Sequence, residues 1–277
     1  MQAHDKTKLV ALLGTPLTQS YAAVMQNIAY EAMGEDMYYF NCEVDNRSLE
    51  GMMEWVRWLG FAGCAITKPN KIKAMDCLDE VDELCRHIGA CNTAVVKNHR
   101  LTGYNTDAIG FSEALKEQYD AEGQRAQVFG AGGAGRAIAM ALAFGGAKRL
   151  LITDPGTGAA QSLVQDLNAY KPHLARMAVG PERANLYVNA SGLGMAPYTD
   201  ESPMSKDEMD PNAFYFDACY NPAKTRFLKD AEERGARVMN GLTMSLYQGA
   251  AQIRLWSGEE APVDVMRMTL QHILENT

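Results

Sequence analysis

The sequence predicts an α/β protein built from two domains, and two observations carry this prediction. Short apolar segments alternate with segments whose apolar residues recur at helical spacing, which is typical of parallel strands joined by helices. In the second half, a glycine-rich turn at 130–135 joins an apolar segment to an alanine-rich helical one. A length of 277 residues with 47% hydrophobic content fits one large or two medium domains with a sizeable core.

Charge and composition exclude several classes of function. The net charge of −8 argues against a nucleic-acid binder, which would need a basic face. The polar N-terminal segment 1–8 lacks the apolar core of a signal peptide, and no run of 18 apolar residues predicts a membrane span. The six cysteines form no C-x-x-C pair and none stands beside a histidine at metal-ligand spacing. We therefore expect a cytoplasmic protein with reduced thiols and no metal site.

The first third of the chain alternates between strands and helices. We predict strands at 8–13, 37–44 and 61–66 and helices at 21–33, 49–59 and 71–87. Gly34 closes the first helix, and Ser20 is a plausible cap for its start. The last helix rests on apolar residues at three-residue steps from Ile72 to Leu84. This alternation implies a parallel sheet.

The segment 90–107 changes the pattern and ends the first domain. It predicts two short strands around a turn at 97–100, followed by Asp107 as the cap of a helix at 108–119. We place the domain boundary at Thr106 and Asp107. Residues 1–106, completed by C-terminal helices within 243–277, form the first domain, and residues 107–242 form the second.

The second domain predicts a Rossmann-like dinucleotide site. Gly130, Gly132 and Gly135 have G-x-G-x-x-G spacing, between a strand at 127–129 and a helix that begins near Arg136. A pyrophosphate would then bind at the start of the helix. The turn that holds it consists of Gly130, Ala131, Gly132, Gly133, Ala134 and Gly135. A strand at 149–153 ends in Asp154, placed where an acid normally bonds the adenosine ribose. A purely structural glycine turn is the alternative, and the flanking features favour the dinucleotide site.

The remaining elements continue the same alternation. We predict helices at 159–170, 225–234, 243–256 and 263–275 and strands at 185–190, 213–219 and 237–239. Polar and glycine-rich residues collect in the loops that follow the strands, where open α/β sheets bind their ligands.

Eight short segments together resemble the shikimate dehydrogenase family, including its quinate/shikimate branch. They are G-T-P-L-T-Q-S (14–20), I-T-K-P-N-K (66–71), I-G-A-C-N-T (88–93), G-Y-N-T-D-A-I-G (103–110), G-A-G-G-A-G-R-A (130–137), N-A-S-G-L-G-M (189–195), D-A-C-Y-N-P (217–222) and N-G-L-T-M-S-L-Y-Q (240–248). The resemblance covers nearly the whole chain. It implies hydride transfer between a nicotinamide cofactor and a cyclic polyhydroxy acid (shikimate or quinate). The reaction interconverts this acid and its oxidised form, the 3-dehydro ketone.

The resemblance also implies roles for individual residues. Lys71 and Asp107 match the family's catalytic pair, which would move the hydroxyl proton during oxidation. From residue type alone, the alternative interpretation is that Lys71 is a solvated lysine and Asp107 a helix cap. Positions that match substrate-binding residues are Ser20, Thr67, Asn92 and Gln248, with Tyr220 near the substrate. Positions that match the nicotinamide side are Asn189, Ala190, Ser191 and Gly241.

Two departures from the family pattern leave the substrate open. Ala22 stands where the family usually has a second serine, and Ala65 where it usually has asparagine. An unreplaced hydrogen-bond partner costs about 1–3 kcal/mol of binding. The smaller side chain at Ala22 suits the bulkier C1 substituent of quinate, so shikimate, quinate and another hydroxy acid remain candidates. A non-catalytic NAD or ligand sensor is a further alternative, against which the presence of both Lys71 and Asp107 counts.

The second nucleotide-domain strand also leads to a cofactor prediction. Members of the family that use NADP carry Asn-Arg-Thr after this strand, whereas this chain has Thr153, Asp154 and Pro155. A carboxylate repels the 2′-phosphate of NADP and accepts bonds from free ribose hydroxyls. The sequence therefore predicts NAD over NADP. The expected partner is a small-molecule acid, without nucleic acid or membrane, and a homodimer is left open.

Overall fold

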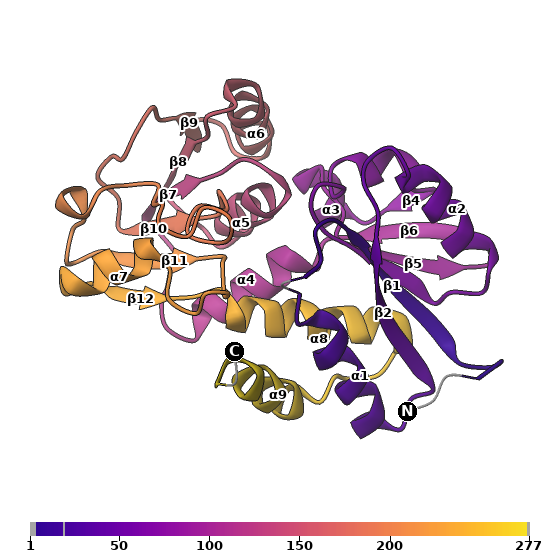
Figure 1. The fold of residues 1–277 in the computed structure, drawn as a ribbon. Helices are drawn as coiled ribbons and strands as arrows, with labels where there is room; N and C mark the ends of the chain where they lie inside the picture. The colour runs from indigo at the N-terminus through magenta and orange to yellow at the C-terminus, as the bar shows by residue number, and fades with distance from the viewer. Residues whose placement is uncertain (1–3, 19, 276–277) are drawn as a thin grey trace. The chain divides into compact units, whose positions relative to one another are not determined.

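The computed structural model describes residues 4–18 and 20–275 as an α/β fold with two compact units (Figure 1). Unit 1 comprises Met1–Gly110 and Ser245–Thr277, and unit 2 comprises Phe111–Met244. The segment 1–8, for which we expect no signal peptide, lies partly outside the described residues. Within the described residues, no helix combines the length and apolar character needed to cross a membrane.

Unit 1 contains a mixed sheet in the order β2-β1-β3-β5-β6-β4. Its strands are β1 Lys8–Gly14, β2 Met37–Glu43, β3 Gly63–Ile66, β4 Glu80–Val81, β5 Thr93–Lys97 and β6 Arg100–Tyr104. Strand β1 pairs in parallel with β2 and β3, as the alternation of strand and helix predicted. Strand β5 runs antiparallel to β3 and β6. Asn98 and His99 have positive φ angles of 51° and 57°, which gives the two-residue turn of the predicted hairpin.

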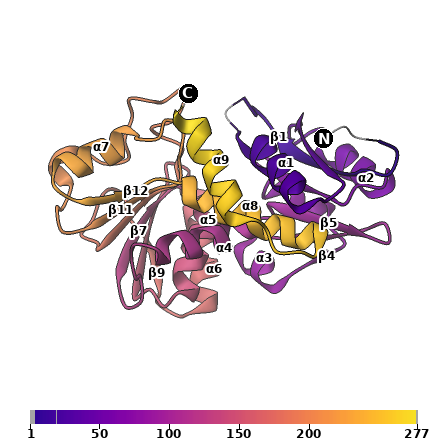
Figure 2. The same ribbon diagram turned by 90° about the horizontal axis from the view of Figure 1, so that it is seen from below.

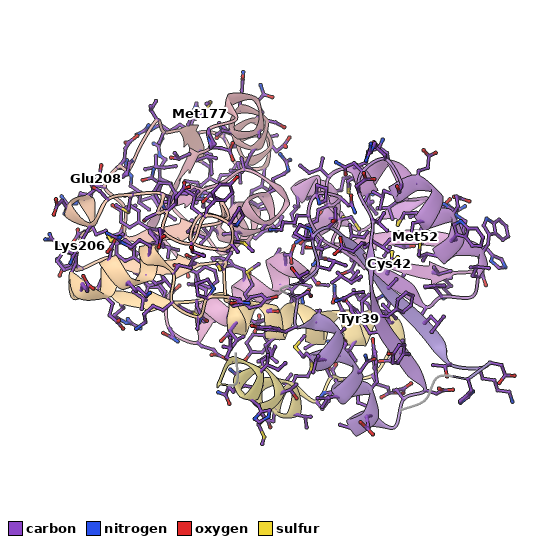
Figure 3. The ribbon with its side chains drawn as sticks, viewed as in Figure 1. Tyr39, Cys42, Met52, Met177, Lys206 and Glu208 are labelled. Carbon is purple, nitrogen blue, oxygen red and sulfur yellow. The ribbon has the colours of Figure 1, made fainter. Side chains whose placement is uncertain are left out.

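Helices cover this sheet and complete its core. They are α1 Ala22–Met33, α2 Leu49–Trp58, α3 Glu83–Ile88, α8 Leu242–Ser257 and α9 Val263–Glu275. Helix α4 Thr106–Lys116 begins in unit 1 and continues into unit 2. Helix α9 packs against α1 (Figure 2). Tyr39 of β2, labelled in Figure 3, is 1% exposed. Its ring packs against Trp256 of α8, with ring centroids 6.1 Å apart. The C-terminal helices are thus part of the first unit's core.

The helix predicted at 71–87 is wrong. The segment forms a 3₁₀ helix, η1 Lys73–Cys77, then strand β4 and helix α3. Asp79 accepts bonds from the backbone N–H of Leu101 and from Arg57, both at 2.7 Å, while β4 pairs in parallel with β6. Asp82 then caps α3 by accepting from the N–H of Cys85 at 2.7 Å. These tertiary hydrogen bonds override a three-residue spacing that is compatible with helix.

Two predicted caps also differ from the structure. Helix α4 begins at Thr106, and Asn105 accepts the Ala108 N–H at 3.3 Å, so Asp107 lies inside the first turn with its carboxylate free for another partner. At α1 the capping position is Tyr21, whose side chain does not cap the helix, and Ser20 Oγ accepts the Ala22 N–H at 3.3 Å.

Unit 2 is a doubly wound sheet whose strands all run parallel, in the order β9-β8-β7-β10-β11-β12. The strands are β7 Arg125–Phe129, β8 Arg149–Thr153, β9 Ala175–Met177, β10 Leu186–Asn189, β11 Phe214–Asp217 and β12 Arg237–Met239. Its other elements are α5 Gly133–Phe144, α6 Thr157–Tyr170, η2 Lys206–Glu208 and α7 Arg226–Glu233. The strand order reverses between β7 and β10, which is the topology of dinucleotide-binding folds. Strand β9 is the one strand of this sheet that the sequence did not predict.

Candidate active site

Lys71 and Asp107 form an ion pair in unit 1. Lys71 Nζ lies 2.5 Å from Asp107 Oδ2, and the two side chains are 15% and 8% exposed. Lys71 follows the turn after β3, where its carbonyl accepts the Cys91 N–H at 2.8 Å. Asp107 projects from the first turn of α4. An ammonium donating to a nearly buried carboxylate is a pair through which a proton can pass.

A buried amide and hydroxyl group hold the start of α4 beside this pair. Asn92 Oδ1 accepts the Thr106 N–H at 2.7 Å, and Asn92 Nδ2 donates to Thr106 Oγ1 at 3.0 Å. Thr106 Oγ1 also lies 3.5 Å from Oε1 of Gln248 on α8. Since Thr106 immediately precedes Asp107, the fold brings the predicted residues Asn92 and Gln248 to the same place as the acid.

The polar network extends beyond the residues that the sequence singled out. Gln252 Nε2 donates to Thr93 Oγ1 at 3.0 Å, and Gln26 Nε2 donates to Gln252 Oε1 at 3.2 Å. Gln26, Thr93 and Gln252 are each no more than 3% exposed. Gln252 lies one helical turn after Gln248, and this spacing is the signal that could have found it.

Ser20 and Thr67 follow the carboxyl ends of two neighbouring strands. Leu13 of β1 pairs in parallel with Ile66 of β3, so the two loops leave the same edge of the sheet. A Cβ at Gly14 would lie 2.3 Å from Thr67 Cγ2, so glycine lets these loops meet closely. The departures from the family pattern also lie nearby, Ala22 as the first residue of α1 and Ala65, 2% exposed, in β3.

In unit 2 the three motif glycines have different surroundings. Gly130 has a φ of 106°, and a Cβ there would lie 2.5 Å from the Ala190 carbonyl oxygen. A Cβ at Gly135 would lie 2.0 Å from the Gly130 carbonyl oxygen. A Cβ at Gly132 would meet nothing within 4 Å. The first and third glycines therefore permit close packing, while the second leaves open space, as a backbone approached by a pyrophosphate requires.

Helix α5 begins at Gly133, inside the turn 130–135 and earlier than the start near Arg136 that the sequence predicted. Its capping position is Gly132, which provides no side-chain hydrogen bond, so the first N–H groups of the helix are left to another acceptor. Gly133, Ala134 and Gly135 make up that first turn. Ala131 and the turn therefore fit a bound phosphate group both by shape and by the positive end of the helix.

The loop after β10 completes the edge at which the strand order reverses. The Ala190 N–H donates to the Phe129 carbonyl at 2.7 Å, beside Gly130. Asn189 Oδ1 accepts from the N–H and hydroxyl of Ser191, at 3.1 and 2.6 Å. The fold thus brings Asn189, Ala190 and Ser191 to the glycine turn, and their role beside the nicotinamide stays a prediction.

Asp217, at the end of β11, is a buried acid that sequence reasoning did not single out. It is 1% exposed and accepts from Thr225 Oγ1 at 2.6 Å, the Cys219 N–H at 2.9 Å and Asn189 Nδ2 at 3.0 Å. Burial raises the pKa of Asp217 to about 6, and these three hydrogen bonds oppose the rise.

Gly241 and Tyr220 also lie in unit 2. The Gly241 N–H donates to the Cys219 carbonyl at 3.0 Å, and a Cβ at Gly241 would lie 2.1 Å from the Ala218 carbonyl oxygen. Glycine at 241 therefore lets the β12 loop pack on the β11 loop. Tyr220 lies in that β11 loop, half-buried.

Two protein-family models match this chain. The model described as "Shikimate dehydrogenase substrate binding domain" matches residues 12–94, and "Shikimate 5'-dehydrogenase C-terminal domain" matches residues 241–271. A relative from Moorella thermoacetica, named shikimate dehydrogenase (NADP(+)), is 39% identical over 99% of this chain and 96% of its own length. A relative of the same name from Methanopyrus kandleri is 36% identical, covering 97% of both chains.

These names contradict the predicted preference for NAD over NADP, which was therefore wrong. The structure gives a physical reason. The prediction treated Asp154 as a free carboxylate facing a ribose. Its Oδ2 accepts the Ala131 N–H and its Oδ1 accepts the Gly156 N–H, both at 2.7 Å. Asp154 thus ties the glycine turn to the end of β8, and its presence does not identify the cofactor.

Solved structures agree with the relatives over nearly the whole chain. A shikimate dehydrogenase in complex with NADP+ has a TM-score of 0.91 and 30% identity, covering 99% of this chain and 98% of its own. A quinate dehydrogenase from Corynebacterium glutamicum in complex with NAD has a TM-score of 0.87 and 30% identity, covering 96% and 99%. Together with the family models and the relatives, these matches show that the chain belongs to the shikimate dehydrogenase family.

Proposed function

We propose that this protein is an NADP-dependent shikimate dehydrogenase, which interconverts shikimate and its 3-dehydro ketone. The observation that carries the proposal is the nearly buried Lys71–Asp107 ion pair at 2.5 Å, in a chain that matches shikimate dehydrogenases named for NADP(+) along almost its full length.

The proposed chemistry needs a proton carrier beside the reacting alcohol. Bound NADP+ would supply the hydride acceptor. During oxidation, Lys71 passes a proton to the Asp107 carboxylate, to which it already donates a hydrogen bond, and takes the hydroxyl proton of the substrate in its place. Reduction runs the same two transfers in reverse. Asn92 and Thr106 keep the acid in position by fixing the first turn of α4.

Other residues bind the two ligands in this proposal. Ser20, Thr67, Asn92 and Gln248 hydrogen-bond the hydroxyls and carboxylate of the substrate, with Tyr220 as a further contact. The turn 130–135 holds the cofactor phosphates, and Asn189, Ala190, Ser191 and Gly241 line the nicotinamide. In this proposal the first domain, 1–106 with 243–277, binds substrate, and the second, 107–242, binds cofactor. Asp107, the first residue after this boundary, belongs to compact unit 1 with Lys71 and acts on the substrate.

Quinate is a second candidate substrate. Ala22 provides no hydroxyl for a substrate carboxylate and leaves more room than serine would. Quinate carries a bulkier C1 than shikimate, and a similar solved structure is a quinate dehydrogenase. Under this alternative, Ala22→Ser lowers quinate turnover relative to shikimate turnover, because the added hydroxyl favours the smaller acid.

The test is nicotinamide reduction by the purified protein, with shikimate and quinate each offered with NADP+ and with NAD+. We expect turnover with shikimate and NADP+ to have the highest kcat/KM of the four pairs. A higher kcat/KM with quinate would identify quinate, rather than shikimate, as the preferred substrate. No turnover with any pair, despite cofactor binding, would reject the proposed reaction and favour another hydroxy acid or a ligand sensor.

A further inference from the structure

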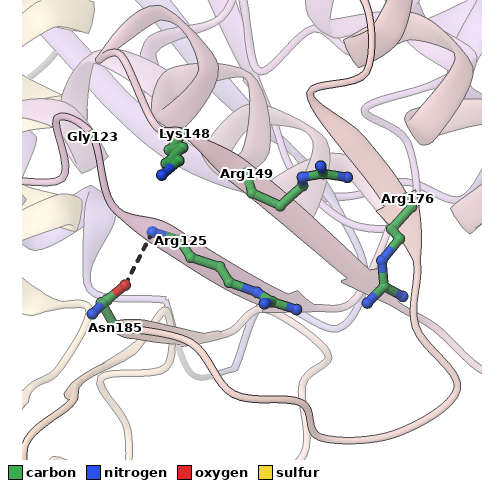
Figure 4. Close-up of a pocket in the computed structure, with 6 residues that line it drawn as sticks. All are labelled: Gly123, Arg125, Lys148, Arg149, Arg176 and Asn185. Carbon is green, nitrogen blue, oxygen red and sulfur yellow. Dashed lines mark hydrogen bonds between the residues drawn. The ribbon is translucent and has the colours of Figure 1, made fainter.

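The sheet of unit 2 has a basic hollow at the edge opposite its glycine turn. The hollow lies at the amino ends of β7, β8 and β9, has a volume of about 540 Å³ and is shown in Figure 4. Its lining residues are Gly123, Arg125, Lys148, Arg149, Arg176 and Asn185. The loops assigned to the cofactor follow the carboxyl ends of the strands, so this hollow is separate from them.

Most of the positive charge in the hollow is uncompensated. Glu182 accepts from both Nη1 and Nη2 of Arg176, the first at 2.8 Å. It also accepts from Arg125 Nη2 at 3.4 Å, so one carboxylate serves two guanidinium groups. Lys148 and Arg149 are exposed, and among the residues that the structure describes neither side chain has a hydrogen-bond or ion-pair partner. This net positive site stands out in a chain whose overall charge is −8.

Arg125 and Asn185 provide further donors without acceptors. Among the described residues, Arg125 Nε is buried and has no hydrogen-bond partner. In the same residues, the contact to Glu182 at 3.4 Å is the one polar contact of its guanidinium, which leaves N–H groups for a further acceptor. Asn185 Oδ1 accepts the backbone N–H of Arg125 at 3.2 Å (Figure 4). The side-chain N–H groups of Asn185 are thus left for a ligand.

The nature of the donors indicates the ligand class. Guanidinium groups bind phosphate oxygens through paired N–H donors, and a lysine adds a point charge. A single carboxylate would satisfy only part of this set, whereas a phosphate group offers several oxygens and more than one charge. We propose that the hollow lined by Arg125, Lys148, Arg149 and Arg176 is a second anion site, which binds a multiply charged phosphate compound independently of the cofactor.

Isothermal titration calorimetry with the whole protein tests this site by measuring the binding of phosphate compounds. Inorganic pyrophosphate and glycerol phosphate are titrated separately into protein saturated with NADP+, so that the turn 130–135 does not compete. We expect saturable binding of at least one of them, and their relative affinities distinguish an inorganic from an organic phosphate. The measurement requires no turnover, so its result does not depend on the proposed reaction.

Matched variants locate the binding. Arg149→Gln removes an unpaired cation of the hollow and is expected to weaken binding about tenfold, while the enzyme's kcat stays unchanged. Lys229→Gln removes the same charge from an exposed position on α7 and should leave binding within about twofold. An absence of binding to the parent protein, an equal loss in both variants, or equal affinity for sulfate (an adventitious ion only) would each overturn the proposal.

Discussion

Hydrogen bonds of Asn70 and of the Lys71 carbonyl fix the backbone from which the Lys71 side chain projects. Asn70 Nδ2 donates to the Val44 carbonyl at 2.8 Å, and the Lys71 carbonyl accepts the Cys91 N–H. The lysine is therefore fixed at its base and paired with Asp107 at its tip. A mobile surface lysine would gain little from such a pair, whereas a nearly buried one is held in one geometry.

Substitution of Lys71 by alanine tests its role. We expect Lys71→Ala to lower kcat by about 10²–10⁴-fold, because the proton carrier is lost. Lys73→Ala is the matched control: that lysine is exposed, pairs with the exposed Asp76, and should leave kcat unchanged. Steady-state kinetics with shikimate and NADP+ measure both. A Lys71→Ala enzyme with parental kcat would remove this lysine from the mechanism.

Asp217 offers a prediction about pH. Its pKa of about 6 in the folded protein exceeds the value of about 3.9 for an unfolded chain, so the native state binds the proton more tightly. Its contribution to stability is therefore greatest below about pH 4 and is lost as the pH rises through about 6. NMR titration of the Asp217 carboxyl should show the raised pKa directly.

The hydrogen bond from Thr225 lowers that pKa, because the hydroxyl stabilises the charged carboxylate. Thr225→Val removes the donor and should move the Asp217 titration to higher pH. Thr225 also caps α7 by accepting the Leu228 N–H at 3.4 Å, so Thr225→Ser, which keeps the hydroxyl, is the control. An unchanged titration in Thr225→Val would mean that burial alone sets the pKa.

At the scale of elements, the glycines of the turn between β7 and α5 have different roles: Gly135 allows close packing, and Gly132 leaves room for the cofactor. Gly135→Ala places a Cβ 2.0 Å from the Gly130 carbonyl oxygen, so the helix must move away from the strand. We expect it to lower the free energy of unfolding by about 1–3 kcal/mol. Thermal or denaturant unfolding measures this loss.

Gly132→Ala tests the binding role of the same turn, for comparison with the packing role tested by Gly135→Ala. Gly132 has an extended backbone with a φ of −72° and open space around it, so alanine should cost less than about 0.5 kcal/mol of stability. We expect its NADP+ Kd to rise, since the added methyl group occupies the approach to the pyrophosphate. Parental NADP+ affinity in a stable Gly132→Ala protein would be evidence against phosphate binding at this turn.

At the scale of the whole molecule, cofactor binding should stabilise the fold. A ligand that binds only the native state at one hundred times its Kd adds about 2.7 kcal/mol to the free energy of unfolding. NADP+ should therefore raise the Tm of the parent protein, and the same concentration should act less on Gly132→Ala. A larger shift with NAD+ than with NADP+ would contradict the proposed cofactor.

Local sequence patterns predicted much of the molecule. The glycine turn between β7 and α5, the hairpin turn predicted at 97–100 and the helix at 263–275 all appear in the structure. In each case neighbouring residues carry the cause: a positive φ, a glycine without a Cβ, or apolar residues on one helical face. The order of the catalytic candidates along the chain likewise came from short segments that resemble one family.

The tertiary structure decided what depends on distant partners. Residues 71–87 formed three short elements because Asp79 and β4 bond to β6, and the three-residue strand β9 has too few residues to show a pattern. Asp107 faces Lys71 rather than capping a helix, and Asp154 holds a turn rather than identifying a cofactor. The sequence by itself determined the α/β alternation and the glycine turn, since those causes are local. Only the fold decided which acid meets which base, since hydrogen bonds between residues far apart in the chain select one of several partners that each side chain could take.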